Sequence, residues 1–336
     1  GKIVVGGASG TLTADQLSRF RFAGYNNGAI QLATGEVVPP GAPTITSLLT
    51  ASSTYGSAAS YTITATNSST SFAAANFPTG MSINTSTGEI TVAATTNAGT
   101  YNITISATNT SGSDSKTLAY TVNKVVLTVT ANDQTVPYGT SVATVTGNGS
   151  YTATGFVNNE DSSVIGGSAT YTTTYTATTA AGTAGVTITP IVTGLTATNY
   201  SFTPANGTIT ISKANSTITV NSPTTSTVTG STGAVTYSYS GTGTTTYGPS
   251  ATLPTASGTY QVVATVALDA NFNEASSAPF EFEIAKANSS VTVKSGTVSN
   301  FTYSGLAQGP AVSDFDFAGS IGAKTVLYTG TGSTSY

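Results

Sequence analysis

Oxygen-bearing side chains alternate in one short segment, at Asp269, Asn271 and Asn273. Oxygen ligands at alternate positions suit Ca²⁺, but a calcium loop of this kind uses glycine at its sixth position, where this chain has Glu274. Asp and Asn side chains also form turns by bonding their own backbone. The segment is therefore a calcium candidate for which we favour a structural turn, and we expect no metal and no cofactor.

The chain lacks the side chains on which nucleophilic catalysis usually depends, because it has no His and no Cys. A Ser with a Lys could replace them, but Lys124, Lys213 and Lys286 recur at the starts of repeated segments, which indicates a structural role. The absence of Cys also excludes disulfides and thiolate metal sites. We expect no catalytic residues.

Two pairs of acidic residues alternate with aromatic ones. Asp314 and Asp316 alternate with Phe315 and Phe317 in one segment, and Glu281 and Glu283 alternate with Phe280, Phe282 and Ile284 in another. Successive side chains of a strand point to opposite faces, so the acids of each pair would face solvent while the aromatic rings face a core. Glycoside hydrolysis needs its two carboxylates in a cleft. The sequence therefore predicts that this protein is not an enzyme.

Composition narrows the classes further. Only 7% of the 336 residues are charged, the net charge is −4, and the nine basic residues are spread singly. Nucleic-acid binding draws on clustered Lys and Arg, so we expect none. No apolar run of 18 residues exists, so we expect no membrane insertion. Abundant Val, Ile, Thr and Tyr favour strands.

Internal repeats organise the chain. Residues 213–220 (KANSTITV) return 73 residues later as residues 286–293 (KANSSVTV), and a more distant copy begins at Lys124. Gly99-Thr-Tyr and Gly258-Thr-Tyr each open a run with period-two alternation, which is typical of a strand with one buried face. Residues 231–247 are echoed by 320–336, which predicts an incomplete last module.

The start of the chain differs. Thr13 and Gln16 form a capping-box pattern, with Leu12 and Leu17 as a hydrophobic staple, and predict a helix that ends near Gly24. We interpret residues 1–39 as the C-terminal part of a preceding module, followed by a proline-rich linker. No other segment predicts a helix.

Two segments carry a family resemblance. Residues 77–90 (FPTGMSINTSTGEI) and 98–109 (AGTYNITISATN) resemble the putative-Ig, cadherin-like repeats of bacterial surface proteins. Residues 127–133 (LTVTAND), 136–139 (VPYG) and 155–161 (GFVNNED) resemble MBG repeats of the Tyr-Gly type. Residues 214–285 and those after 286 resemble a second MBG type. These resemblances imply extracellular spacers and adhesive stalks without catalytic residues.

The predicted fold is all-β, a rod of tandem immunoglobulin-like sandwiches with one short helix near the N-terminus. The predicted domains are residues 1–39 (the preceding module), 40–123 (putative-Ig, cadherin-like), 124–212 (MBG, Tyr-Gly type), 213–285 (MBG) and 286–336 (incomplete MBG).

Three functions follow from these patterns. The favoured one is a fragment of a large secreted bacterial surface adhesin or stalk, whose partners are the neighbouring modules of the same long chain. The second is a filament subunit assembled by β contacts between chains, since strand edges with few Lys invite pairing. The third is an ancillary module of a secreted polysaccharide-active enzyme, or a module binding cell-surface glycans, through exposed aromatic rings: Tyr237, Tyr239, Tyr247 and Tyr303.

Overall fold

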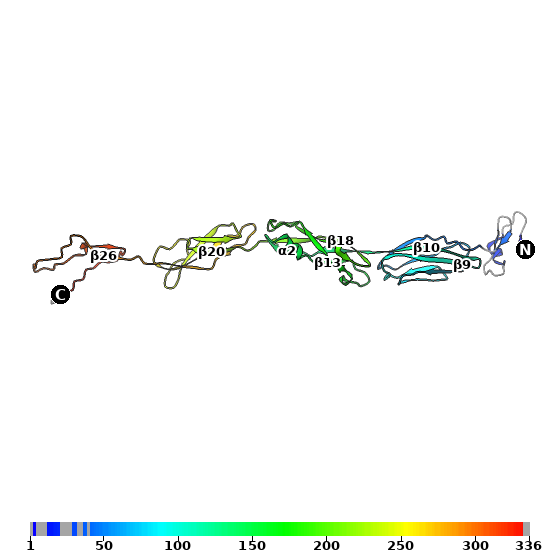
Figure 1. Ribbon diagram of the computed structural model, residues 1–336, viewed down its shortest axis with the longest axis horizontal. Coiled ribbons are helices and arrows are strands. Elements are labelled where there is room, and N and C mark those ends of the chain that lie inside the picture. The colour runs from blue at the N-terminus through cyan, green and yellow to red at the C-terminus, as the bar shows by residue number, and fades with distance from the viewer. Residues whose placement is uncertain (1–2, 5–11, 21–28, 32–35, 39–40, 332–336) are drawn as a thin grey trace. The chain divides into compact units, whose positions relative to one another are not determined.

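The computed structural model describes residues 3–4, 12–20, 29–31, 36–38 and 41–331. The chain forms two compact units, Gly1–Ser212 and Lys213–Tyr336, and each is described by itself. Strands dominate both units (Figure 1). The prediction of an all-β chain of Ig-like sandwiches is confirmed.

A small sheet and a short helix begin the first unit. The sheet has the order β1-β3-β2, with bounds β1 (Ile3–Val4), β2 (Ile30–Gln31) and β3 (Glu36–Val38). Helix α1 (Ala14–Ser18) has the predicted capping box, in which the Gln16 amide donates to Thr13 Oγ1 at 3.2 Å and the Thr13 amide donates to Gln16 Oε1 at 2.8 Å. The helix ends at Ser18, so the prediction that it continues to Gly24 was wrong.

The next two sheets form an Ig-like sandwich over residues 42–123. One sheet has the order β4-β10-β9-β6, with bounds β4 (Thr50–Thr54), β6 (Ser71–Ala75), β9 (Gly99–Asn109) and β10 (Gly112–Asn123). The other has the order β5-β8-β7, with bounds β5 (Ala59–Thr62), β7 (Met81–Ile83) and β8 (Glu89–Val92). Strand β10 pairs parallel with β4 and antiparallel with β9.

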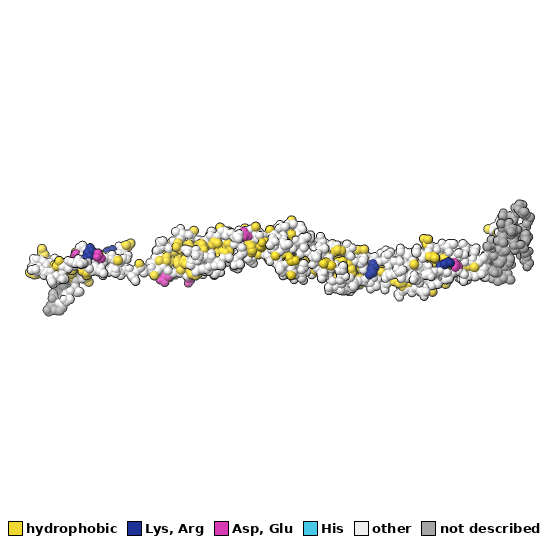
Figure 2. All heavy atoms as spheres, turned by 45° about the horizontal axis from the view of Figure 1, so that its top comes forward, with side chains coloured by type: hydrophobic (Ala, Val, Ile, Leu, Met, Phe, Trp, Pro, Cys, Tyr) yellow, Lys and Arg dark blue, Asp and Glu magenta, His cyan; other side chains and the backbone are white. Residues whose placement is uncertain are grey.

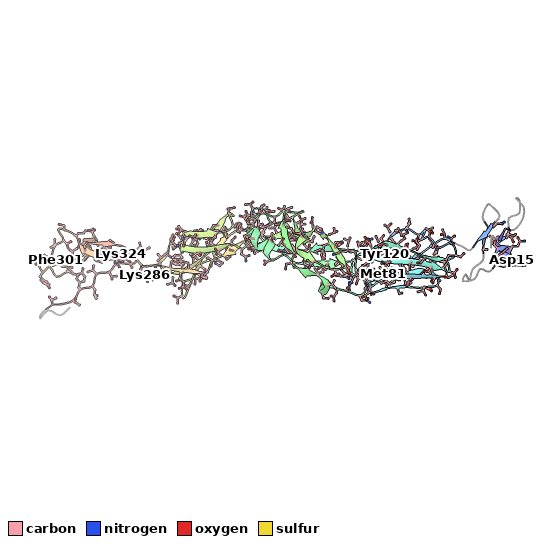
Figure 3. The ribbon with its side chains drawn as sticks, turned by 45° about the vertical axis from the view of Figure 1, so that its right-hand side comes forward. Asp15, Met81, Tyr120, Lys286, Phe301 and Lys324 are labelled. Carbon is pink, nitrogen blue, oxygen red and sulfur yellow. The ribbon has the colours of Figure 1, made fainter. Side chains whose placement is uncertain are left out.

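Alternation along these strands builds the core of the sandwich. Ile103 and Ile105 of β9, Leu118 of β10 and Ile90 of β8 are fully buried, while their neighbours along the strands are mostly exposed or half-buried. Side chains of this kind contribute about 1.5–3 kcal/mol each when buried. Figure 3 labels Met81 and Tyr120 among these strands.

The second domain of the first unit follows without an intervening loop, because β10 ends at Asn123 and β11 begins at Val125. One sheet has the order β13-β11-β18, with bounds β11 (Val125–Ala131), β13 (Tyr151–Thr154) and β18 (Tyr200–Ala205). Another has the order β12-β19-β16-β15, with bounds β12 (Gln134–Pro137), β15 (Thr170–Thr173), β16 (Thr187–Ile191) and β19 (Gly207–Ser212). A two-stranded sheet pairs β14 (Gly166–Gly167) with β17 (Leu195–Thr196).

This domain also contains helices that the sequence did not predict. They are α2 (Val142–Gly147) and the 3₁₀ turns η1 (Ser162–Val164) and η2 (Val192–Gly194). Ser141 caps α2 by accepting a hydrogen bond from the Thr144 amide at 3.1 Å, and Val145 is fully buried. The expectation of a single helix was therefore wrong, because a helix of six residues is too short to show a helical period.

The second unit contains one larger sheet, one hairpin and one further two-stranded sheet. The larger sheet joins β22 (Val235–Gly241), β23 (Gly258–Val266) and β24 (Ala275–Ser276), and β25 (Phe280–Ile284) also pairs with β23. The hairpin is β20 (Thr217–Ser222) with β21 (Thr225–Thr229), and a separate two-stranded antiparallel sheet pairs β26 (Ser290–Val293) with β27 (Phe315–Ala318), which follows η3 (Val312–Asp314).

The two Gly-Thr-Tyr segments make the same local contact, as their repetition predicts, although Tyr260 is buried and Tyr101 is half-buried. Each begins a long strand, β9 at Gly99 and β23 at Gly258. The Tyr101 hydroxyl donates to the carbonyl of Asn97 at 2.7 Å, and the Tyr260 hydroxyl donates to the carbonyl of Ala256 at 2.8 Å, four residues back in both cases.

The repeated KANS segments differ in their burial. Ile218 and Val220 of β20 are each 7% exposed and pack against Val262 in the core of their domain. The matching residues of β26, Val291 and Val293, are 59% and 62% exposed. Only β27 pairs with β26 among the described residues, so no strand covers this apolar face as β23 covers that of β20.

Candidate functional site

The calcium candidate forms a turn in which the Asp269 carboxylate is fully engaged. Oδ1 accepts from the amides of Asn271 and Phe272, both at 2.8 Å, and Oδ2 accepts from the amide and hydroxyl of Thr232 at 2.8 and 3.1 Å. A carboxylate has about four lone-pair sites, so these bonds fill it. A cation would have to displace them, which favours the structural turn.

The other two residues of the candidate do not converge on that carboxylate. The Asn271 carbonyl accepts from the amide of Ala214 at 2.9 Å, and Asn273 Nδ2 donates to Asn215 Oδ1 at 3.1 Å. Hydrogen bonds from the backbone amides of Thr232 and Asn271 lower the pKa of Asp269 to about 2. Among the described residues, no group of three or more His, Cys, Asp or Glu side chains could hold a metal ion.

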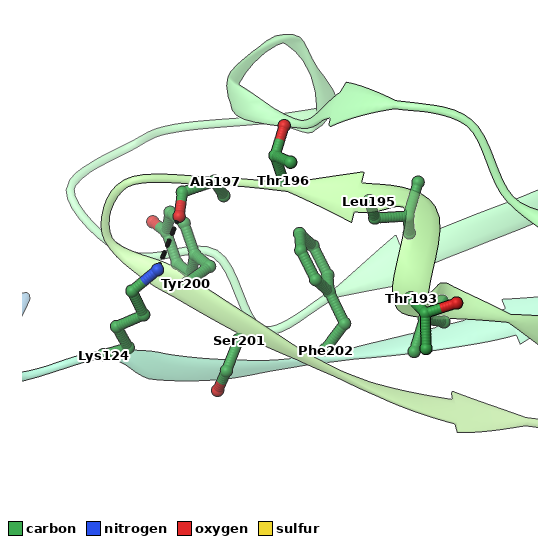
Figure 4. Close-up of a pocket in the computed structure, with 9 residues that line it drawn as sticks. Lys124, Thr193, Leu195, Thr196, Ala197, Tyr200, Ser201 and Phe202 are labelled. Carbon is green, nitrogen blue, oxygen red and sulfur yellow. Dashed lines mark hydrogen bonds between the residues drawn. The ribbon is translucent and has the colours of Figure 1, made fainter.

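The recurring lysines tie the starts of two domains to a loop. Lys124 Nζ donates to the carbonyl of Ala197 at 2.8 Å (Figure 4), and the amide of Val125 donates to the carbonyl of Asn199 at 3.0 Å. Val125 then pairs parallel with Tyr200. We name residues 197–200 the first clamp loop.

The second unit repeats this arrangement. Lys213 Nζ donates to the carbonyl of Asp269 at 2.6 Å, and the amide of Ala214 donates to the carbonyl of Asn271 at 2.9 Å. Ala214 then bridges in parallel to Phe272. We name residues 269–272 the second clamp loop. The same three backbone contacts therefore recur in both loops, while Ala197 is replaced by Asp269 and Tyr200 by Phe272.

The acidic pairs lie where solvent reaches them. Glu281 and Glu283 are exposed on β25, while Phe280 and Phe282 are half-buried. Asp316 is exposed on β27, but Asp314 ends η3, so the prediction that both aspartates share one strand was wrong. Charged side chains are sparse and scattered on the face that Figure 2 shows.

The tyrosines proposed to bind sugars do not form one exposed platform. Tyr239 is 4% exposed, and its hydroxyl donates to the carbonyl of Pro223 at 2.7 Å. The prediction that Tyr239 is an exposed ring was therefore wrong. Tyr237 stacks on it with ring centroids 6.5 Å apart, and Tyr247 packs edge-on against Tyr260. Tyr303 alone of the four proposed residues is largely exposed, at 93%.

The contacts that sequence reasoning missed lie between the two domains of the first unit. Glu160 accepts hydrogen bonds from two tyrosines, Tyr55 of the Ig-like domain at 2.9 Å and Tyr200 of the first clamp loop. The rings of Tyr55 and Tyr200 meet edge-to-face with centroids 5.8 Å apart. Burial of the Tyr200 hydroxyl and its bond to Glu160 raise its pKa to about 12.

Three further contacts join the same domains. Asn199 Oδ1 accepts from the amide of Ala98 at 2.9 Å, and Asn199 Nδ2 donates to Asn97 Oδ1 at 3.2 Å. Asn158 Nδ2 donates to the carbonyl of Ala94 at 3.1 Å. The paired residues are 101, 102 and 64 positions apart in sequence. Asn158 belongs to the motif at residues 155–161 on which the MBG resemblance rests, but that motif gave no sign of its partner.

Three open cavities flank the first clamp loop. One, about 520 Å³, is lined by the residues that Figure 4 draws, among them Lys124, Leu195 and Phe202. The only charged group in its lining is Lys124, which already bonds Ala197. A second, about 540 Å³, has no charged group in its lining, and the third, about 290 Å³, lies against Glu160 and Asn97. None brings together a nucleophile with a base.

Within the described residues, no helix is long and apolar enough to cross a membrane. No curated protein is significantly similar to this sequence.

Solved structures share limited similarity with the chain. The titin domains Z1Z2 in complex with telethonin are 17% identical over 52% of this chain and 98% of the titin chain, with a TM-score of 0.27. The N-terminal four Ig domains of Dscam1 isoform 4.44 are 11% identical over 56% of this chain and 61% of that one, with a TM-score of 0.27. A "putative alpha-galactosidase/melibiase" from Bacteroides fragilis is 19% identical over 30% of this chain, with a TM-score of 0.24. The match spans only 22% of that galactosidase and 21% of a second one.

Family models assign the two domains of the first unit. Residues 42–123 match the family described as "Putative Ig domain", and residues 127–210 match the MBG domain of the YGX type. Both are non-catalytic module types. Residues 42–210 are therefore a tandem of one Ig-like and one MBG-type module, with the Ig domain directly followed by the MBG domain.

Proposed function

We propose that this chain is part of a large secreted bacterial surface adhesin or stalk, in which its modules act as structural spacers. One observation carries the proposal. The Ig domain runs into the MBG domain with only Lys124 between their strands, and side chains of both domains pack together there. A joint without Gly or Pro, filled by packed side chains, suits a part that must hold its neighbours apart.

Measuring the length of the protein in solution tests the spacer function. A module with strands of about 8–10 residues is about 30–35 Å long at about 3.3 Å per residue. We expect small-angle scattering of the whole chain, compared with a variant lacking residues 213–285, to show a loss of maximum dimension of about one module. An unchanged maximum dimension would contradict the spacer function.

A second candidate is a filament subunit assembled by β contacts between chains. The low charge of the strands favours it, because only nine of the 336 residues are Lys or Arg, and charged side chains on edge strands are one device that prevents pairing with another chain. We expect sedimentation velocity to show association that rises with protein concentration. A parent chain that stays monomeric at high concentration would eliminate this candidate.

A further inference from the structure

The buried residues of the first unit do not divide where its two families meet. One hydrophobic cluster contains the core of the Ig domain together with Leu127 and Tyr200 of the MBG domain. Phe156, Val157 and Phe202 of the MBG domain pack against this cluster. The remaining MBG core, around Val145, forms a separate cluster with residues of β12, β16 and β19. The MBG domain therefore has a proximal half, next to the Ig domain, and a distal half.

Polar contacts close the boundary around the shared core. Tyr55 is 5% exposed and Tyr200 is 2% exposed, and both hydroxyls donate to the one carboxylate of Glu160. Hydrogen bonds to a charged group contribute about 1.5–3 kcal/mol, and a buried group left without its partner costs a comparable amount. Neither tyrosine can leave this carboxylate without that cost.

Backbone shape at the boundary is also matched to the partner domain. Gly56 has a φ of +85°, and a Cβ at this position would lie 2.6 Å from Cγ2 of Val157. Its amide donates to the carbonyl of Ala94 at 2.9 Å, which also accepts from Asn158 Nδ2 at 3.1 Å. The Ig domain therefore presents a glycine where Val157 of the MBG domain leaves no room for a Cβ.

We propose that the proximal half of the MBG domain is a docking surface for an Ig domain carrying the Tyr55-Gly56 pair, and that the Ig domain and this half fold and open as one cooperative unit. This unit crosses the family boundary near residue 124. The inference does not rest on the proposed function, because it concerns stability within one chain. Cooperative units of this kind are visible in native-state hydrogen exchange.

The test is hydrogen exchange of the whole chain, read by mass spectrometry for each strand, in the parent and in Tyr200→Phe. The variant keeps the ring and removes the hydroxyl that donates to Glu160. We expect exchange to become about tenfold faster not only in β11 and β18 but also in β9 and β10 of the Ig domain, as loss of one charged hydrogen bond implies. Unchanged exchange in β9 and β10 would overturn the proposal.

Tyr175→Phe is the matched control. Tyr175 is equally buried at 2% exposed, lies in the distal cluster, and donates its hydroxyl to the carbonyl of Thr140 within the same domain. We expect exchange to become faster in β16 and β19 and to stay unchanged in the Ig domain. If both variants made the Ig-domain amides exchange equally faster, the proposal that the Ig domain is coupled specifically to the proximal half would be overturned. If Tyr200→Phe fails to fold, Glu160→Gln, which keeps the side-chain shape, gives the same readout.

Discussion

The first and second clamp loops share their backbone contacts but are anchored differently. The first loop is held from outside, because Asn199 bonds to Asn97 and Ala98 of the Ig domain and the ring of Tyr200 packs on Tyr55. The second loop is held from within, because the Asp269 carboxylate accepts four bonds from its own unit. Ala197, at the position of Asp269, has no side-chain acceptor. The same loop backbone is therefore stabilised in two ways. Where the loop begins with Ala197 it relies on contacts to a neighbouring domain, and where it begins with Asp269 the carboxylate holds it within its own unit.

The largest expected effect is that of Gly56→Ala at the Ig–MBG boundary that anchors the first loop. The new methyl group would meet Val157 and would also sit at positive φ, so we expect the free energy of unfolding of the first unit to fall by about 2–4 kcal/mol. Urea denaturation followed by circular dichroism measures it. Gly139→Ala is the control, since Gly139 has a φ of +82° with nothing within 4 Å, and should cost only about 1 kcal/mol. Equal losses would mean that the approach of Val157 is unimportant.

Asp269→Asn should have the next largest effect, confined to the second unit. An amide keeps one acceptor oxygen and turns the other atom into a donor, so it cannot accept all four bonds. We expect a clear fall in Tm for the second unit and none for the first. Asp133→Asn, which alters a single bond from the Thr208 amide, should change Tm less. A Tm shift in the first unit would contradict the self-contained character of the second loop.

The lysines should contribute small and similar amounts. Lys124→Met and Lys213→Met each remove one hydrogen bond to a loop carbonyl, which we expect to cost about 1 kcal/mol, the usual net contribution of one hydrogen bond. Hydrogen exchange of each loop would measure the loss. A much larger acceleration of loop exchange for Lys124→Met than for Lys213→Met would mean that the two lysines do not stabilise their loops equally.

Changes of pH near neutrality should leave the stability of both loops unchanged. The two loops should differ only in strong acid or strong base. The folded pKa of Asp269 is lowered from 3.8 to about 2, so its stabilisation is present above pH 3.8 and is lost as pH falls through 2. The folded pKa of Tyr200 is raised from 10 to about 12, so its stabilisation is present below pH 10 and is lost as pH rises through 12. Exchange measured at both extremes should therefore release the second loop in acid and the first in base. The reverse order would contradict the assignment.

The features that depend only on neighbouring residues were predicted from the sequence. The capping box at Thr13 and Gln16, the strand beginning at Gly99 and the alternation of acids with phenylalanines on β25 all follow from short-range chemistry. Lys124 and Lys213 each donate to a clamp-loop carbonyl, which agrees with a structural role, although the pattern could not show these bonds. Helix α2 was missed because one and a half turns show no period.

The boundary between the Ig and MBG domains could not be predicted for a different reason. Tyr55 and Glu160 are 105 residues apart in sequence, and each looks ordinary in its own segment. Glu160 lies in a polar turn, and nothing nearby signals that two buried hydroxyls will reach it. Tyr239 was misplaced on the surface because strand alternation identifies two faces without showing which one another sheet covers.

The most direct test of the account is the distance distribution across the Ig–MBG boundary. The chain has no Cys, so spin labels at Thr117→Cys on β10 and Thr210→Cys on β19, both exposed, would be the only labelled sites. We expect double electron–electron resonance to give one narrow distance that broadens in Glu160→Ala. A broad distribution in the parent, unchanged by Glu160→Ala, would contradict a joint held by these side chains.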